Sequence, residues 1–312
     1  MNHSLSNIKK AKKILDNHDC VAIPTETVYG LAANAYSDRA VKKIYKLKKR
    51  PKYNPLIVHY FNLDDLEKDC EINNNFLSLF KRFCPGPITF ILKLKKNSKI
   101  SKMVTNKKNT LAVRFPKHTI AQKLLKTLDY PLAAPSANES TKLSSVCYQD
   151  VRDEFGNKIK LILNGGKSSI GLESTIISLV KNPKILRLGG LTVSNIEKIL
   201  KKDLKLKLYS SKFLSPGQMK VHYSPGIPIR LNIKKPKKNE AYLLLKKRKK
   251  FKKNTYHLSK KGSLNEAAKN LYSTLRKIKK DKFKSIAVEK IKNQGLGRTI
   301  NDRLLRASRF YG

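Results

Sequence analysis

Residues 20–60 read CVAIPTETVYGLAANAYSDRAVKKIYKLKKRPKYNPLIVHY. The stretch begins as a short apolar strand that Pro24 ends, since proline cannot donate to a strand ladder. A helix with an apolar stripe follows, capped by Asp38 and stopped by Pro51, and residues 55–60 form a second apolar strand. Residues with hydroxyl groups therefore follow the first strand, and cationic residues lie at the end of the helix. We expect one wall of a site for an anionic substrate with polar groups.

Strands and helices alternate beyond this stretch, which predicts an α/β domain. Further strands are expected at residues 88–94, 110–115, 131–138, 160–163, 174–180 and 184–188. Amphipathic helices are expected at residues 6–17, around 76–83, at 119–128 and after Gly190. In the last of these, Ser194 and Glu197 form a capping-box pattern.

The chain changes character after residue 201. Leucine and lysine alternate, and two Ser-Pro-Gly turns bracket Val221-His222-Tyr223, so residues 202–226 are expected to form an extended linker between residues 1–201 and 227–312. In residues 227–312 a small α/β domain is predicted, with a long helix that opens on a Ser263/Glu266 capping box. Its strands are expected at 228–232, 241–245 and 285–289 and its helix at about 264–279.

The chain of 312 residues is strongly basic, with 68 Lys and Arg against 22 Asp and Glu and a net charge of +46. This charge favours anionic partners such as RNA or nucleotides. Lysine is also frequent outside any motif, and a general abundance of surface lysine accounts for part of the excess. The run KKRKKFKK at 246–253 fits either a surface that faces tRNA or a solvated loop, and we favour the loop.

The four cysteines show no metal-ligand spacing and are expected to be reduced thiols. No apolar run of signal-peptide length occurs at the N-terminus, and no segment approaches the length of a membrane span. We therefore expect a cytoplasmic protein.

Several familiar motifs are incomplete or missing. The segment GGKS at 165–168 would need a glycine at the position of Leu161 to be a phosphate-binding loop, and Gly295-Leu296-Gly297 lacks a third glycine, which leaves a turn. The sequence contains neither an H-E-x-x-H nor a G-x-S-x-G pattern, so nucleophilic hydrolase chemistry is poorly supported.

Four polar patches remain, and each by itself is an ordinary turn or a solvated helix end. They are Thr25 to Tyr29, the group Lys48, Arg50 and Asn54, Ser136 to Asn138, and Gly171 to Thr175. Their order along the chain is more specific. In sequence we find PTETVYGL, K-x-R-P-x-x-N-P-L, CPGPIT, R-x-P, APSAN, ST-I, R-x-G and HYSPG.

This order resembles the YrdC-like threonylcarbamoyl-AMP synthases, in their long form with an additional C-terminal domain. The resemblance covers residues 8–226 densely and returns at 295–297 and 300–304. It implies a twisted, mixed open sheet with flanking helices, followed by the small α/β domain. It also implies that residues 202–226 form a lid, with Tyr223 folded over the nucleotide.

The resemblance further implies that L-threonine, bicarbonate and ATP condense to threonylcarbamoyl-adenylate and pyrophosphate, the first step of N6-threonylcarbamoyladenosine formation in tRNA. The L-threonine site would comprise Thr27, His59, Arg114, Ala134 and Ser174. The ATP site would comprise Arg50, Asn54, Thr110, Ser136, Asn138, Ser144, Arg187 and Tyr223, and the catalytic cations would be Lys48 and Arg50.

This chemistry agrees with the residues. A carbamate oxygen is already a nucleophile, so positioning and charge stabilisation suffice without a strong general base. Mg²⁺ is expected to bind together with ATP. Glu26 and Glu173 are the only carboxylates in the motifs that are candidates to contact it. Further partners would be tRNA or a downstream threonylcarbamoyl-transfer complex. Two alternatives are an RNA-binding module and a carbamoyl-transfer enzyme on the same fold, whose acylphosphatase and zinc-finger segments are missing here.

Overall fold

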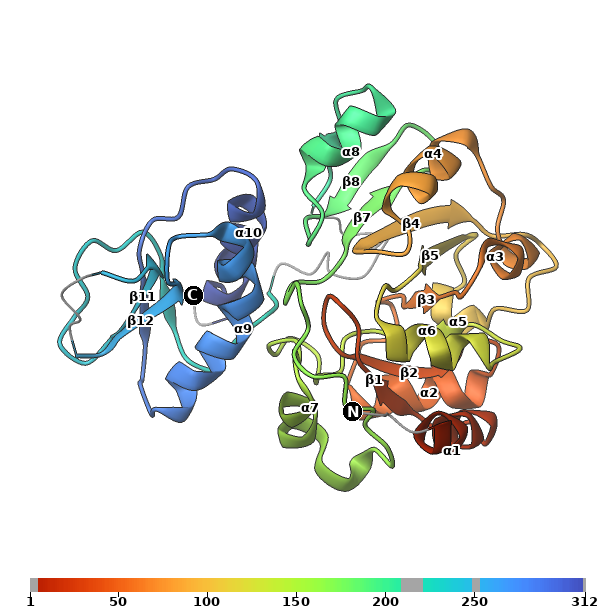
Figure 1. Ribbon diagram of the computed structural model, residues 1–312, viewed down its shortest axis with the longest axis horizontal. Coiled ribbons are helices and arrows are strands. Elements are labelled where there is room, and N and C mark those ends of the chain that lie inside the picture. Colours follow the sequence, from red (N-terminus) through yellow and green to blue (C-terminus); the bar gives the residue numbers. More distant parts are fainter. Residues whose placement is uncertain (1–4, 209–220, 249–252, 311–312) are drawn as a thin grey trace.

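The computed structural model describes residues 5–208, 221–248 and 253–310, which form two lobes (Figure 1). Residues 209–220 of the predicted lid and residues 249–252 of the KKRKKFKK run lie outside these residues. Among the described residues, no helix combines the length and the apolar character needed to cross a membrane.

The large lobe is built on a sheet with the strand order β1-β2-β6-β3-β5-β4-β7-β8-β9. The sheet is mixed, because the pairs β3–β5, β4–β7 and β8–β9 are parallel and the others are antiparallel. Its strands are β1 (Val21–Ile23), β2 (Gly30–Asn34), β3 (Ile57–His59), β4 (Ile88–Lys93), β5 (Thr110–Arg114), β6 (Leu132–Ala133), β7 (Thr175–Ser178), β8 (Lys184–Arg187) and β9 (Lys205–Leu206). Its helices are α1 (Leu5–Asp16), α2 (Asp38–Leu47), α3 (Leu63–Asp69), α4 (Asn74–Phe83), α5 (Lys102–Thr105), α6 (Thr119–Lys126), α7 (Tyr148–Phe155), the 3₁₀ helix η1 (Gly156–Lys158) and α8 (Val193–Leu200).

The small lobe contains a parallel sheet with the order β10-β13-β11-β12. Its elements are β10 (Ile229–Arg230), β11 (Ala241–Lys246), β12 (Thr255–Ser259), α9 (Leu264–Lys280), β13 (Ile286–Val288) and α10 (Leu296–Ser308). The predicted fold class, a mixed α/β sheet followed by a small α/β domain, is confirmed.

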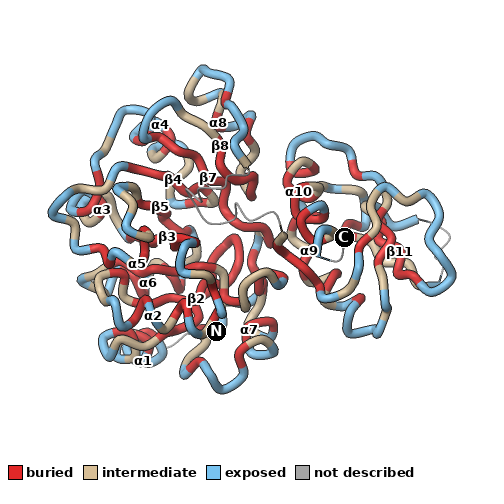
Figure 2. Tube along the Cα trace, turned by 180° about the vertical axis from the view of Figure 1, so that it is seen from behind, coloured by how far each residue is buried: buried red, intermediate tan, exposed pale blue. Residues whose placement is uncertain are grey.

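Burial is concentrated in the strands of both sheets and on the inward sides of the helices (Figure 2). The main core of the large lobe lies on one face of its sheet, where Val58 and Val113 point. Because side chains alternate across a strand, the neighbours Ile57 and Ala112 point to the other face, where they form a smaller apolar cluster. That second face is the floor of the site described below.

A shared apolar cluster joins the two lobes. Val28 and Leu172 of the large lobe are buried in it together with Leu271 of α9 and Ile300 of α10. The backbones approach closely at Gly171, which has a φ of +74°, and a Cβ there would lie 2.6 Å from the backbone of Lys269. Only glycine combines this conformation with this contact, so the segment before Ser174 is fixed against α9.

Several elements differ from the predictions. β2, α3, α5, β12 and α10 were not predicted, and residues 160–163 form only an isolated bridge, between Ile162 and Ala22. The helix cap predicted at Asp38 is at Ser37, whose side chain accepts from the amide of Ala40.

The two predicted capping boxes also differ from the structure. The helix expected to open at Ser194 begins at Val193 after Thr192, which makes no side-chain cap bond, and Glu197 accepts from the amide of Leu204 instead. The second box is half formed. Ser263 accepts from the amide of Glu266, but the Glu266 carboxylate turns to Ser259 and Lys260.

Candidate functional site

A pocket lies over the second face of the large sheet, where β3, β5 and β8 end beside the segment that leads into β7. Its lining residues are Thr25, Val28, Tyr29, Gly30, Arg50, Ile57, His59, Arg114, Ala134, Pro135, Ser136, Ser144, Glu173, Ser174, Arg187, His222 and Tyr223. The structure therefore brings together residues from all four polar patches and from the HYSPG segment.

The residues predicted for the site divide into two groups. Those in the pocket wall are Arg50, His59, Arg114, Ala134, Ser136, Ser144, Ser174, Arg187 and Tyr223. Those outside the wall are Thr27, Lys48, Asn54, Thr110 and Asn138. Four of this second group are buried and support the wall from behind; Thr110, at the start of β5, is partly exposed.

The turn after β1 is rigid because Thr25 organises it. The Thr25 hydroxyl donates to the carbonyl of Val28 (2.6 Å) and accepts from the amides of Thr27 and Val28 (both 3.2 Å). Since that hydroxyl has a single proton, the Thr27 hydroxyl is the donor in the 2.8 Å contact between the two side chains. Thr27 thereby fixes the turn.

Arg114 and His59 lie side by side because β5 pairs in parallel with β3, opposite the same position. Arg114 forms a buried ion pair with Glu26, with 2.7 Å between Nη2 and Oε1. The Nε of Arg114 and both ring nitrogens of His59 are buried and have no hydrogen-bond partner of normal geometry among the described residues. Burial, together with the charge of Arg114, holds the pKa of His59 well below its usual value. Both residues line the pocket, so a small polar anion bound there would meet a cation and a neutral imidazole.

Ser174 is held by Arg187 and Thr89. The Arg187 guanidinium donates to the carbonyl of Ser174 through Nε (3.0 Å) and Nη2 (2.9 Å), and also reaches its hydroxyl (3.0 Å). The Thr89 hydroxyl lies 2.6 Å from the same oxygen. Ser174 is therefore fixed in the wall next to a buried positive charge.

Lys48 and Asn138 shape the turn that carries Ser136. The Lys48 ammonium is buried and donates to the carbonyls of Ser136 (2.5 Å) and Asn138. The Asn138 amide in turn donates to the carbonyls of Glu139 and Lys142. Burial and the neighbouring Arg50 hold the pKa of Lys48 well below its usual value. The Lys48 side chain is thus directed at backbone behind the pocket.

Arg50 is anchored at the pocket by its own loop. Its Nε donates to the carbonyl of Asn54 (3.0 Å), and its Nη2 donates to that of Pro55 (2.9 Å). Burial is the main cause that lowers the pKa of Arg50 to about 10, so it is charged at neutral pH. Arg50 and Arg187 give the pocket two guanidinium groups, and such groups bind phosphate oxygens well.

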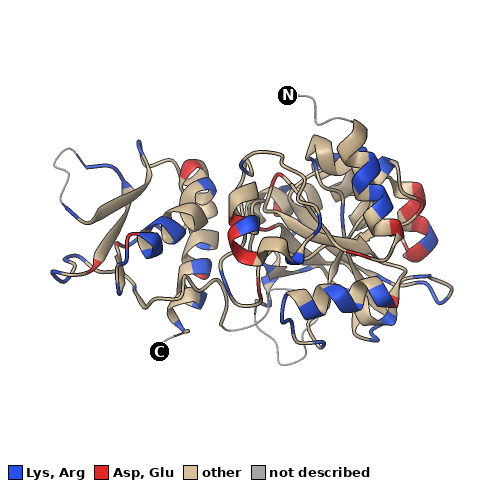
Figure 3. Ribbon diagram, turned by 90° about the horizontal axis from the view of Figure 1, so that it is seen from below, with Lys and Arg blue, Asp and Glu red and all other residues tan. Residues whose placement is uncertain are grey.

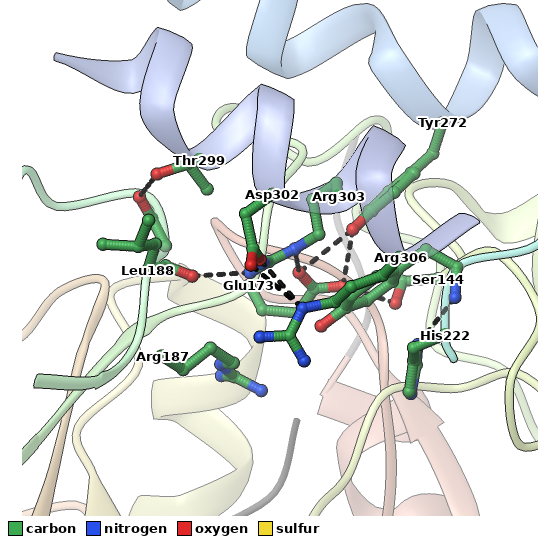
Figure 4. A network of polar contacts seen from close by, with 12 residues as sticks. Ser144, Glu173, Arg187, Leu188, His222, Tyr272, Thr299, Asp302, Arg303 and Arg306 are labelled. Atoms are coloured by element: carbon green, nitrogen blue, oxygen red, sulfur yellow. Dashed lines mark hydrogen bonds and ion pairs between the residues drawn. The ribbon is translucent and has the colours of Figure 1, made fainter. Parts of the chain in front are cut away.

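Glu173 is the centre of a polar network between the lobes (Figure 4). It accepts hydrogen bonds from the hydroxyls of Ser144 (2.6 Å) and Tyr272 (3.0 Å) and from Nε of Arg303 (2.9 Å). Burial by itself would raise the pKa of Glu173, but the guanidiniums of Arg303 and Arg187 outweigh it and lower the pKa to about 2. Glu173 was predicted to lie in a polar patch and near a metal ion, but its partners in α9 and α10 were not predicted.

This shift predicts a pH dependence of stability. Because the pKa of folded Glu173 is below its unfolded value, its contribution is complete above about pH 4.5 and is lost as the pH falls toward about 2. We expect Glu173→Gln to remove a contribution of roughly 3 kcal/mol at pH 7. Urea unfolding from pH 7 to pH 2 measures it as the difference between wild type and variant. The exposed Glu67→Gln is the control, and a pH-independent difference would contradict the assignment.

Comparison with known proteins places the chain. A family profile described as "Telomere recombination" matches residues 13–189, and one described as "Threonylcarbamoyl-AMP synthase, C-terminal domain" matches residues 191–309. The chain is 35% identical to the threonylcarbamoyl-AMP synthase of Pyrococcus abyssi, over 93% of this chain and 90% of that protein. It is also 35% identical to the threonylcarbamoyl-AMP synthase of Bacillus subtilis, over 96% of this chain and 92% of that protein.

The similarity also includes the three-dimensional structure. The crystal structure of P. abyssi Sua5 complexed with L-threonine superposes with a TM-score of 0.89 and 32% identity, covering 97% of this chain and 94% of that one. Both lobes are therefore matched in sequence and in fold. The chain belongs to the threonylcarbamoyl-AMP synthase family, in the two-domain form that carries the Sua5 C-terminal domain.

Proposed function

We propose that the pocket is the site at which this threonylcarbamoyl-AMP synthase joins L-threonine, bicarbonate and ATP, the first step of N6-threonylcarbamoyladenosine formation in tRNA. The observation that carries the proposal is the set of unpartnered donors at Arg114 and His59 beside the anchored cations Arg50 and Arg187. One pocket thereby offers a clamp for a small carboxylate and a separate region for phosphates.

L-Threonine binds at the end nearer β3 and β5. Its carboxylate meets Arg114, which keeps Nε available although Glu26 occupies another of its nitrogens. Ser174 lies in the same wall and offers the hydroxyl oxygen that Arg187 and Thr89 fix. A charged carboxylate in this buried place requires a paired guanidinium, since an isolated buried charge is costly.

ATP binds at the end nearer Arg50 and Arg187. These guanidiniums neutralise the phosphates, which allows an anionic carbamate oxygen to approach the α-phosphorus. They also stabilise the charge that grows on the departing pyrophosphate. The new bond joins the carbamate oxygen to the α-phosphorus, and the bond from the α-phosphorus to the bridging oxygen breaks. In the preceding step the amino nitrogen of L-threonine bonds to the carbon of bicarbonate, water leaves, and the proton of the ammonium group passes to solvent. For the attack on phosphorus the protein supplies position and charge, and that attack requires no general base.

Mg²⁺ is expected with ATP, held mainly by phosphate oxygens. Among the described residues no cluster of three or more His, Cys, Asp or Glu side chains offers a metal site. The two nearby carboxylates are engaged, because Glu26 pairs with Arg114 and Glu173 pairs with Arg303. The residues present therefore fit a metal that arrives with its nucleotide and shields its charge.

The proposal includes electrostatic contact with tRNA. Lys and Arg residues occur along the helices of both lobes (Figure 3). A general affinity for RNA phosphates needs no more than this, and no single face of the described residues is assigned to it.

The reaction is tested by pyrophosphate release from ATP, with and without L-threonine and bicarbonate. The proposal requires release that depends on both. An RNA-binding module would instead show salt-sensitive tRNA affinity and no threonine-dependent consumption of ATP.

The Tyr223→Ala variant tests the described end of the predicted lid. Tyr223 is buried in the pocket wall, with the Arg303 guanidinium 4.6 Å from its ring centroid and the Tyr272 ring at 5.9 Å. We expect weaker ATP binding or faster loss of the adenylate, because the ring closes one side of the pocket. Tyr223→Phe keeps the ring and is the control. The unfolding temperature checks that the alanine variant is folded. An unchanged rate and ATP affinity in that variant would contradict the lid role.

A further inference from the structure

The C-terminal lobe reaches the pocket at Ser144 through two neighbouring side chains of α9. Tyr272 and Arg276 are four residues apart and therefore lie on the same face of the helix. Arg276 donates to the backbone carbonyls of Leu143 (2.7 Å, from Nη2) and Ser144 (3.0 Å, from Nη1). Tyr272 donates to the carboxylate of Glu173. One face of α9 thus fixes both the backbone of Ser144 and the group that binds its hydroxyl.

The direction of the hydrogen bond at Ser144 follows from the charge of its partner. Glu173 is buried and paired with Arg303, whose Nε lies 2.9 Å from Oε2. A carboxylate ionised in this way can only accept. The single hydroxyl proton of Ser144 is therefore committed to Glu173, at 2.6 Å. Ser144 lines the pocket and is fully buried. A ligand group that reaches its oxygen would meet lone pairs only, so that group must be a donor.

We propose that Tyr272, Arg276 and Arg303 of the C-terminal lobe are positioning residues of the nucleotide site, which hold Ser144 as a hydrogen-bond acceptor for a donor group of ATP. This inference rests on the proposed function and extends it to the second lobe. The donors that ATP offers are the ribose hydroxyls and the amino group of adenine. Phosphate oxygens cannot occupy this place, because they accept and do not donate.

The first experiment identifies the donor with nucleotide analogues. We measure threonine-dependent pyrophosphate release with ATP, 2′-deoxy-ATP, 3′-deoxy-ATP and inosine triphosphate. Wild type should discriminate against one of the three analogues by about tenfold or more in kcat/KM, since a lost donor leaves the oriented acceptor unpaired. Ser144→Ala should lose that discrimination. Equal kcat/KM values for all four nucleotides in wild type would overturn the proposal and leave the proposed reaction intact, whereas absence of release with ATP itself would contradict the reaction.

The second experiment tests the role of the C-terminal lobe. Tyr272→Phe removes the hydroxyl and keeps the ring that stacks with Tyr223. We expect the KM for ATP to rise about fivefold, with the KM for L-threonine nearly unchanged. The matched control is Tyr256→Phe, which removes a tyrosine hydroxyl that binds Asp281 elsewhere in the same lobe.

A double-mutant cycle separates positioning from general support of the fold. If Tyr272 acts through Ser144, Tyr272→Phe should have no further effect on the KM for ATP in a Ser144→Ala background. A full additional effect in that background, or equal rises in the KM values for ATP and L-threonine, would show a structural role and overturn the proposal. Unfolding temperatures of all variants confirm that each one is folded.

Discussion

Replacement of Arg114 by alanine should lower kcat/KM for L-threonine by at least ~100-fold, since the substrate carboxylate loses both its charge-assisted hydrogen bond and its paired cation. The KM for ATP should change much less, because the phosphates are assigned to Arg50 and Arg187. The measurement is threonine-dependent pyrophosphate release at saturating ATP and bicarbonate. Lys117→Ala, which removes an exposed lysine three residues away, is the matched control.

The same variant leaves Glu26 without its cation. A buried, unpaired carboxylate would repel the carboxylate of L-threonine, so part of the loss would come from Glu26 and not from the missing clamp. The double variant Arg114→Ala/Glu26→Gln separates the two contributions, and some activity should return in it. Wild-type threonine affinity in Arg114→Ala would remove Arg114 from the site.

Replacement of Arg50 by alanine should reduce the rate of pyrophosphate release by about 10²-fold or more, the usual effect of losing one charge-stabilising donor. The reason is that the carbonyls of Asn54 and Pro55 hold the guanidinium in place before the substrate arrives, so little reorganisation accompanies the reaction. Single-turnover measurement at saturating ATP and L-threonine reports the chemical step.

Two further variants control this result. Arg50→Lys keeps the charge but not the planar group that reaches both carbonyls, and it should restore only part of the rate. Arg82→Ala, an exposed arginine in α4, should leave the rate unchanged. Near-wild-type turnover of Arg50→Ala would contradict the role assigned to Arg50.

The sequence predicted the elements whose local signals agree with their final environment. α2 carries its buried residues Val41, Ile44 and Tyr45 at helical spacing, and it formed where it was predicted. The hairpin of β7 and β8 was predicted from two apolar runs around Asn182-Pro183. In both cases one stretch of chain contains all the information that the element needs.

The missed elements lack such local signals. β2 reads GLAAN and contains no β-branched or aromatic residue, so its strand conformation depends on pairing with β1 and β6. α10 has Leu296, Ile300 and Leu304 at helical spacing, which could have revealed it. Its buried face also holds charged side chains, which mask an apolar stripe.

The predicted site residues show the same division. Motif resemblance located the pocket wall, but it could not distinguish a side chain that faces the pocket from one that holds the wall. Lys48 illustrates this, because its cation is directed to two backbone carbonyls. Which face a residue presents is decided by tertiary contacts that a single sequence does not contain.

The contact between Glu173 and Arg303 has a consequence for how the pocket is assembled. The two residues are 130 positions apart, so their approach must close a long loop of chain before it can contribute. Contacts of this kind generally form slowly compared with local helices and hairpins. During refolding, helical content should therefore recover before nucleotide affinity does. The rate at which the lobes dock would then determine the rate at which enzymatic activity appears.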